Sequence, residues 1–198
     1  MQYFDTLPKV IYKTGALSQV YTNLLARASM LPDFIKNSSN YYKYTVQEGD
    51  TPEIIANKYY GDSYRYWIVL FSNQITDPQW DWPLSPVLFQ QYIESKYAGA
   101  NPHNIMHHYE KTITQLDVNT QTKSSQTVTV DQITYENTPE TTVTINATSG
   151  PVIVTVTKEF VSLYEYEYNV NESKKSIYLL NSIYVGEIEK ELKKLMAP

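Results

Sequence analysis

The sequence predicts an α+β protein in which helices flank a central domain and an antiparallel β-rich lobe. Helical periodicity with capping residues fills much of residues 41–98, whereas alternating Thr, Val and Tyr residues fill most of 99–175. We therefore expect four parts. An N-terminal arm and amphipathic helix occupy 1–40, and the central domain occupies 41–98. The β-rich lobe follows at 99–175, and a C-terminal docking helix ends the chain at 176–198.

The composition limits the classes of function. The chain has 198 residues, no cysteine and a net charge of −5, so it can bury a core without disulfides and offers no thiol nucleophile or thiolate ligand. No basic stripe favours nucleic acid as a partner. The start of the chain lacks a secretion signal, and no apolar run approaches the ~20 residues of a membrane span. We expect a soluble protein with no membrane partner.

Its 19 tyrosines are of a type enriched at protein interfaces.

An amphipathic helix is predicted between Gly15 and Pro32 because apolar residues recur there at helical spacing. These residues are Leu17, Val20, Tyr21, Leu24, Leu25 and Ala28.

A second helix is predicted at 52–60 from its capping residues. Thr51 suits the N-cap and Pro52 the first helical position. Alternatively, Asp50 is the N-cap and Glu53 closes a capping box. Gly61 can adopt the left-handed conformation that ends a helix.

The rest of the central domain contains two further helices. Residues 41–46 alternate and predict a short strand, and 63–72 predict a helix with almost no polar face. Such a helix must be covered on all sides, by the rest of the chain or by another subunit. Residues 77–86 read as a packed aromatic loop, and a third helix follows until Gly99.

Beyond Gly99 the apolar period changes to two, which predicts antiparallel strands. The alternating runs are 105–109, 111–118, 127–135, 141–146, 152–161 and 164–170. The chain closes with an amphipathic helix from about Ser182, acidic early and basic late, as the helix dipole favours.

Eleven residues of the central domain resemble the opening strand and first helix of a LysM module. They are Tyr44, Thr45, Val46, Gly49, Asp50, Thr51, Ile54, Ile55, Ala56, Lys58 and Tyr59. LysM modules usually finish with a short strand, and here the aromatic segment DPQWDWPLS takes that place. The fold class is therefore refined to a LysM-like central domain, whereas ordinary glycan binding becomes doubtful.

A longer pattern resembles a narrower family, the baseplate wedge subunit numbered fifty-three of myoviruses. It comprises YKYTVQEGDTPEIIANKYYGD, YWIVLFSNQITDPQWDWPLS, YIESKY and HHYE, and covers roughly residues 27 to 110. The resemblance implies a structural protein of the contractile tail that joins adjacent wedges and helps close the baseplate ring around the hub. It also implies multiple copies with other wedge and hub subunits in a six-fold assembly, a location in the virion baseplate, and host cytoplasm during assembly. No enzyme activity, cofactor or metal is expected.

Aromatic and apolar side chains in or near the family pattern and on the last helix are the candidate partner contacts. They are Tyr66, Trp67, Trp80, Trp82, Tyr92, Tyr97, Ile188 and Leu192. Periodicity favours a core position for Trp67, whereas Trp80 and Trp82 alternate in a loop, so that at least one should face outward.

Carboxylates and histidines are the residue types in this sequence that could carry out acid–base or metal chemistry. Glu48, Asp50 and Glu53 are expected to serve the helix start, and Asp77 and Asp81 the backbone of the loop. His107 and His108 are adjacent, so in a strand their rings should point to opposite faces and not share a metal ion.

Two rival functions remain open at this stage. The chain could be a LysM-type module that binds peptidoglycan, or a hydrolase of the tail. Retention on insoluble peptidoglycan would favour the first, and clearing in a cell-wall zymogram would favour the second.

Overall fold

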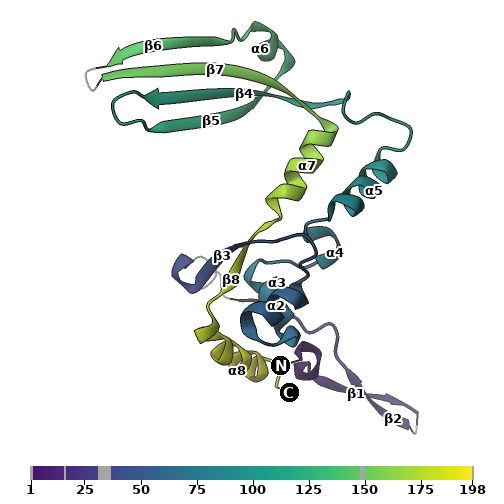
Figure 1. Cartoon of the computed structure of the whole chain (residues 1–198). Coiled ribbons are helices and arrows are strands. Elements are labelled where there is room, and N and C mark those ends of the chain that lie inside the picture. The colour runs from purple at the N-terminus through teal and green to yellow at the C-terminus, as the bar shows by residue number, and fades with distance from the viewer. Residues whose placement is uncertain (1, 16, 31–36, 148–149, 198) are drawn as a thin grey trace. The chain divides into compact units, whose positions relative to one another are not determined.

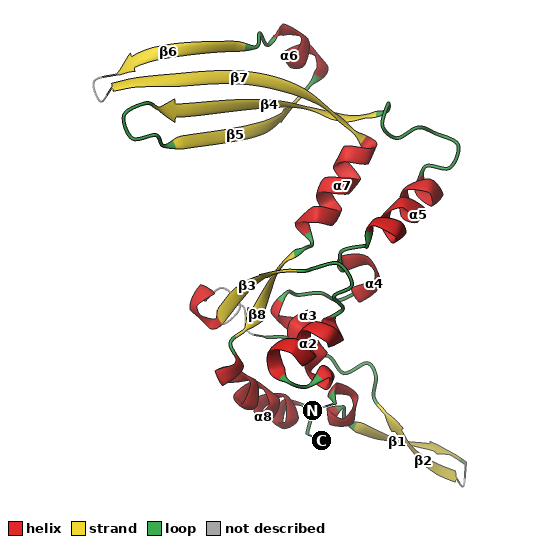
Figure 2. Cartoon of the chain, viewed as in Figure 1, coloured by secondary structure: helices red, strands yellow, loops and turns green. Residues whose placement is uncertain are grey.

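The computed structural model describes residues 2–15, 17–30, 37–147 and 150–197. The chain divides into two compact units, which we treat separately: unit 1 is Met1–Ser85 with Glu172–Pro198, and unit 2 is Pro86–Asn171. Helices alternate with antiparallel strands in both (Figures 1 and 2). The expected α+β class is confirmed. No helix among the described residues is both long and apolar enough to cross a bilayer.

Unit 1 is built on a strand–helix–helix–strand arrangement. Strand β3 (Tyr41–Thr45) leads to helices α2 (Pro52–Tyr60) and α3 (Tyr66–Ser72), and β3 pairs antiparallel with β8 (Ser176–Leu180). The partner strand of β3 therefore comes from the part of the sequence that follows unit 2, as the colours of Figure 1 show. A 3-10 turn at Ser63–Arg65 separates the two helices.

The ends of α2 match the capping prediction. The side chain of Thr51 accepts a hydrogen bond from the Ile54 amide at 3.3 Å. Gly61 ends the helix in the left-handed conformation, with φ 70°, and its N–H donates to the Asn57 carbonyl. Thr51, rather than Asp50, is therefore the N-cap, which decides between the two alternatives.

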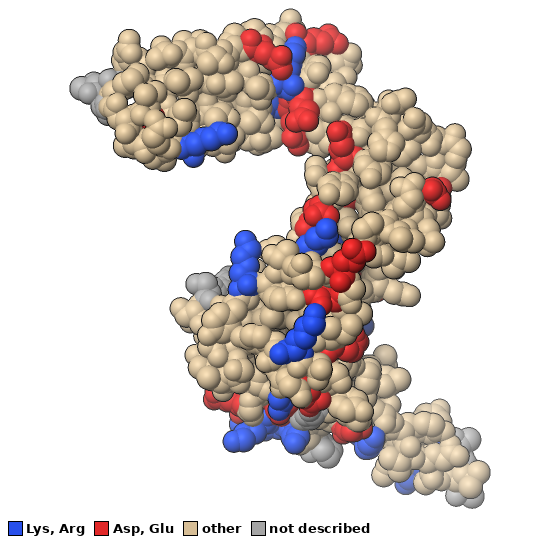
Figure 3. Space-filling model, in the orientation of Figure 1, with Lys and Arg blue, Asp and Glu red and all other residues tan. Residues whose placement is uncertain are grey.

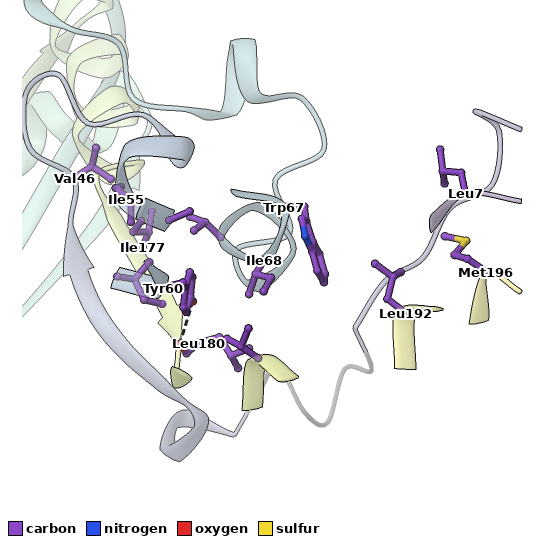
Figure 4. Close-up of a cluster of buried hydrophobic side chains, with 14 residues drawn as sticks. Leu7, Val46, Ile55, Tyr60, Trp67, Ile68, Ile177, Leu180, Leu192 and Met196 are labelled. Carbon is purple, nitrogen blue, oxygen red and sulfur yellow. Dashed lines mark hydrogen bonds between the residues drawn. The ribbon is translucent and has the colours of Figure 1, made fainter. Parts of the chain in front are cut away.

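The apolar helix α3 is covered by its own chain. Trp67, Ile68 and Val69 are 2%, 0% and 0% exposed. They belong to a core that also contains Leu7 from the N-terminal segment and Leu180 from β8 (Figure 4). Segments distant in sequence therefore supply the cover that the short central helices could not.

The C-terminal helix α8 (Val185–Leu195) follows a 3-10 turn at Ser182–Tyr184, which confirms the predicted helix. Its Val185 and Leu192, with Met196 after it, are buried in the same core. The apolar stripe of α8 therefore packs within unit 1.

The predicted N-terminal amphipathic helix is wrong over its described part. A 3-10 turn at Tyr3–Thr6 is followed by a hairpin of β1 (Lys9–Thr14) and β2 (Leu17–Thr22). Gly15, with φ 63°, provides the left-handed residue of the turn. The spacing of apolar residues in β2 suited a helix, but the β-branched run opposite it made strand pairing available. The end of the predicted helix, at residue 31, lies outside the described residues.

Unit 2 holds a four-stranded antiparallel sheet of order β5-β4-β7-β6. Helix α5 (Pro86–Lys96) confirms the third predicted helix and leads toward the sheet. The strands are β4 (Met106–Asp117), β5 (Lys123–Val130), β6 (Thr141–Ala147) and β7 (Gly150–Ser162).

Three segments predicted as strand or loop are helical. Residues 132–137 form α6 (Gln132–Asn137), and the 77–86 connection contains α4 (Pro78–Asp81). The predicted strand at 164–170 is helix α7 (Leu163–Ser173). Ser162 and Glu165 form a reciprocal capping box there, because each backbone N–H donates to the other's side chain, at 2.8 and 3.2 Å.

Candidate partner interface

Trp80 is the most exposed of the eight candidate contact residues, at 63%. It lies on α4, whose start is fixed by the Asp77 side chain, which accepts from the Gln79 amide at 3.0 Å. Lys174 Nζ donates to the Trp80 carbonyl from the segment that precedes β8. The indole is therefore presented outward from a backbone that is held at both ends, and the expectation that one loop tryptophan faces outward is met.

Trp82 behaves differently, because it packs against the core of unit 1. Its indole Nε1 donates to the Asp50 carbonyl oxygen at 3.0 Å. The aromatic connection is therefore anchored to the start of α2, and Trp80 and Trp82 have different surroundings although they are separated by one residue.

Asp50 is a buried carboxylate at the centre of a polar cluster in unit 1. Its carboxylate accepts from the Tyr44 hydroxyl at 2.6 Å, the Lys58 amine at 2.6 Å and the Gln47 amide at 3.1 Å. Burial alone would raise the pKa of Asp50, but these hydrogen bonds outweigh it and lower the pKa. The bond to Asp50, with burial, raises the pKa of Tyr44 to about 12. Asp50 thus connects β3 to α2 through Tyr44 and Lys58. It does not cap α2, which was the alternative role expected for it.

A groove of about 670 Å³ lies beside α4 in unit 1. Its lining residues come from α4, the segment after α3 and the two strands. They include Tyr41, Asn73, Ile75, Asp81, Lys174 and Tyr178. Asn73 also bridges to β8, since its side chain accepts from the Tyr178 amide and donates to the Tyr178 carbonyl at 2.7 and 2.8 Å.

Tyr92 and Tyr97 meet at a buried carboxylate in unit 2. The two hydroxyls and the Lys96 amine donate to Glu167 at 3.0, 2.9 and 2.6 Å. Burial would raise the pKa of Glu167, but these bonds outweigh it and lower the pKa. The pKa of Lys96 is raised, chiefly by its hydrogen bond to Glu167. This cluster joins α5 to α7.

The remaining candidates lie in or against the core of unit 1. Trp67 and Leu192 are buried, at 2% and 4% exposed, and Tyr66 and Ile188 pack against them partly buried. Trp67 Nε1 has no hydrogen-bond partner among the described residues. The core position favoured for Trp67 is thus confirmed. The role of the eight residues in partner contacts stays a prediction, for which Trp80 is best placed.

The loop carboxylates serve the backbone, as expected. Asp77 caps α4, and Asp81 accepts from the Asp77 amide at 3.2 Å. The carboxylates of Asp77 and Asp81 therefore stabilise the local backbone around α4.

The expected arrangement of the histidines is wrong. A β-bulge between Met106 and His108 in β4 breaks the alternation. As a result His107 Nδ1 and His108 Nδ1 lie 2.7 Å apart, and His108 Nε2 lies 2.8 Å from Glu110. Even so, the described residues contain no group of three or more side chains that could hold a metal ion.

Two exposed apolar surfaces carry none of the eight candidate contact residues. One is the β1–β2 hairpin, where Tyr12 and Leu17 are 65% and 69% exposed. The other is one face of the unit 2 sheet, where Val143 and Ile145 are more than half exposed. The alternation of Val, Ile and Thr in the predicted strands was the signal for the second.

The chain belongs to the family of base plate wedge protein 53, whose match covers residues 19–195. It is therefore a structural protein of the phage tail baseplate.

One relative is baseplate wedge protein gp53 of Enterobacteria phage T4, which is 27% identical over 88 residues. That match covers 39% of this chain and 45% of the T4 protein, so it spans less than half the length of that relative.

Proposed function

We propose that the chain joins adjacent wedges of the baseplate and helps close the ring around the hub, in multiple copies with six-fold symmetry. The observation that carries this proposal, beside family membership, is the exposed indole of Trp80, whose backbone is held by hydrogen bonds and whose neighbour Asp81 lines a groove. A rigid aromatic side chain loses little entropy on binding and is typical of interface hot spots. The role needs no catalytic residue.

The LysM-like character of residues 41–98 is part of this proposal. The order β3, α2, α3, β8 supports it, since LysM modules open and close with a strand. The closing strand would then come from 176–180 instead of the aromatic segment. The aromatic segment DPQWDWPLS then forms α4 and presents Trp80. This difference from a LysM module is consistent with recognition of a protein instead of a glycan.

The test is incorporation of purified variants into baseplates assembled without the wild-type chain. Trp80→Ala should reduce incorporation at least about tenfold, because removal of a central aromatic anchor costs ~2 kcal/mol or more. Tyr64→Ala, at a 54% exposed aromatic position in the 3-10 turn between α2 and α3, is the matched control and should incorporate normally.

Equal incorporation of the Trp80 and Tyr64 variants would contradict the interface assignment. Saturable retention of the wild-type chain on insoluble peptidoglycan, lost in the Trp80 variant, would favour the glycan-binding alternative instead.

A further inference from the structure

The sheet of unit 2 has two chemically different faces. Register places Ile113, Val128, Val143, Ile145, Val154 and Val156 on one side, which we call the apolar face. The opposite side carries hydroxyl residues that bond across strands, namely Thr112 to Thr127, Thr114 to Ser125 and Thr142 to Thr155, at 2.8, 3.1 and 3.4 Å. An antiparallel sheet with this alternation normally buries its apolar face and leaves the polar one in water.

The apolar face is mostly uncovered within unit 2. Helix α6 covers one end, because Tyr135 stacks on Tyr109 at 4.3 Å and the Lys158 amine donates to the Tyr135 carbonyl at 2.8 Å. Among the described residues of this unit, no helix crosses the rest of the face (Figure 2). Val143 and Ile145 remain 54% and 52% exposed.

The whole sheet approaches the size of a protein interface. The four strands contain 12, 8, 7 and 13 residues. At a rise of ~3.3 Å per residue and a strand spacing of ~4.8 Å, they cover roughly 600 Å². A standard interface buries ~800 Å² of accessible surface on each partner. A second sheet of the same size would cover it.

The apolar face carries opposite charges at its two ends. Lys111 and, opposite it on β7, Lys158 lie near the α6 end. Asp117, whose Oδ1 also accepts from the Asn119 and Thr120 amides, lies about 20 Å away at the other end of β4. Between the two ends, the register places no charged residue on this face. On the side of the sheet that Figure 3 shows, charged side chains are also gathered near α6 and sparse elsewhere. A two-fold axis that crosses β4 near Thr114 would place each Lys111 opposite the Asp117 of a second copy.

The position of α6 agrees with the same axis. Because α6 covers the Tyr109 end, it would lie just beyond Asp117 of the opposing copy, where that copy's β4 ends. The open parts of the two faces could then meet at the ~10 Å separation of packed sheets.

From these observations we propose that two copies of the chain pair sheet against sheet through the apolar face, as a two-fold dimer. Such a contact stops at two copies and does not continue around a rotational ring. The dimer is therefore distinct from the wedge-joining contact and goes beyond the proposed function. It protects an exposed apolar surface, next to the uncharged edge strand β6, that would otherwise invite aggregation before assembly.

The experiment is sedimentation velocity on the purified full-length chain between about 1 and 100 µM, with Val143→Lys and Thr144→Lys as a matched pair. Both positions are exposed on β6 and point to opposite faces. The wild-type chain and Thr144→Lys should dimerise, whereas Val143→Lys should weaken the dimer at least about tenfold, because it places an unpaired ammonium in an apolar contact.

A third variant, Lys111→Glu, tests the orientation of the pair. Lys111 lies directly opposite Lys158 on β7, so the substitution replaces a like-charge pair with an attractive one inside the same sheet. The sheet should therefore be no less stable, while the dimer should weaken about threefold or more at low salt, since the new carboxylate meets Asp117 of the other copy.

A wild-type chain that sediments as a monomer at every concentration would overturn the proposal. So would equal effects of the two lysine substitutions, or a dimer unchanged or strengthened by Lys111→Glu. The assay contains no other baseplate protein, so its failure is separable from failure of the wedge-joining function. Far-UV circular dichroism of each variant verifies that a loss of pairing is not a loss of fold.

Discussion

The hydroxyl of Tyr60 donates a 3.0 Å hydrogen bond to the carbonyl oxygen of Leu180, which lies 120 residues further along the chain. Tyr60 is the last residue of α2 and Leu180 the last of β8. The bond therefore joins the segments before and after unit 2, and burial of its hydroxyl raises the pKa of Tyr60. Unit 1 is therefore stabilised by a contact between two of its segments that are separated in the sequence by the whole of unit 2.

Tyr60→Phe should destabilise unit 1 by ~1 kcal/mol, because the buried Leu180 carbonyl loses its partner while the ring packing is kept. Urea unfolding followed by tryptophan fluorescence reports on unit 1, since Trp67, Trp80 and Trp82 all lie in it. Tyr64→Phe removes an exposed hydroxyl and should change stability by less than ~0.5 kcal/mol. Equal effects would mean that the Tyr60 bond is not formed in solution.

The Glu167 cluster should make the helix pair α5–α7 sensitive to acid. The pKa of Glu167 is lower in the folded chain than its ordinary value of 4.5, so the unfolded chain binds more protons as the pH falls through this range. The stabilisation is therefore complete above pH 4.5 and is lost as the pH drops through the folded pKa.

Glu167→Gln should lower the stability of unit 2 by about 2 kcal/mol at pH 7 and flatten this acid dependence, because the ion pair with Lys96 is gone. Amide hydrogen exchange of α5 and α7 from pH 3 to 7 measures both effects. Glu94→Gln, at an exposed position of α5, serves as the control and should leave the pH profile of the wild-type chain intact.

Substitutions on the apolar side of α8 test whether the helix belongs to the core of unit 1 or serves mainly to dock on a partner. Leu192→Ala should cost about 3 kcal/mol, because Leu192 is 4% exposed and its removal leaves a cavity in unit 1. Leu195→Ala, on the same helix but 68% exposed, should cost less than ~0.5 kcal/mol. Urea unfolding by tryptophan fluorescence again provides the measurement, and a small cost at Leu192 would show that α8 does not pack on the core in solution.

Local chemistry explains which elements could be predicted. The caps at Thr51 and Gly61 act over a few residues, so α2 was predicted with the bounds that the structure shows. The capping box of Ser162 and Glu165 is equally local and begins α7, whereas the alternation of Tyr164, Tyr166 and Tyr168 alone predicted a strand.

Tertiary contacts determine the conformation of the N-terminal hairpin and the orientation of Trp80 and Trp82 at the candidate interface. The apolar spacing of β2 was compatible with a helix, and pairing with β1 settled its conformation. Similarly, the sequence indicated that at least one of Trp80 and Trp82 faces outward, but nothing near them showed which one. That Trp82 donates to the Asp50 carbonyl depends on how the segment after α4 packs against the start of α2.

The sequence by itself determined the α+β class, the family, the ends of α2 and the burial of Trp67, because these depend on composition, motif and periodicity within short windows. Only the tertiary structure decided that β8 pairs with β3, that α8 and Leu7 cover α3, and that one face of the unit 2 sheet is left open. The physical reason is that burial is a property of which distant segments meet, and a hydrophobic pattern specifies that a face must be covered without specifying what covers it.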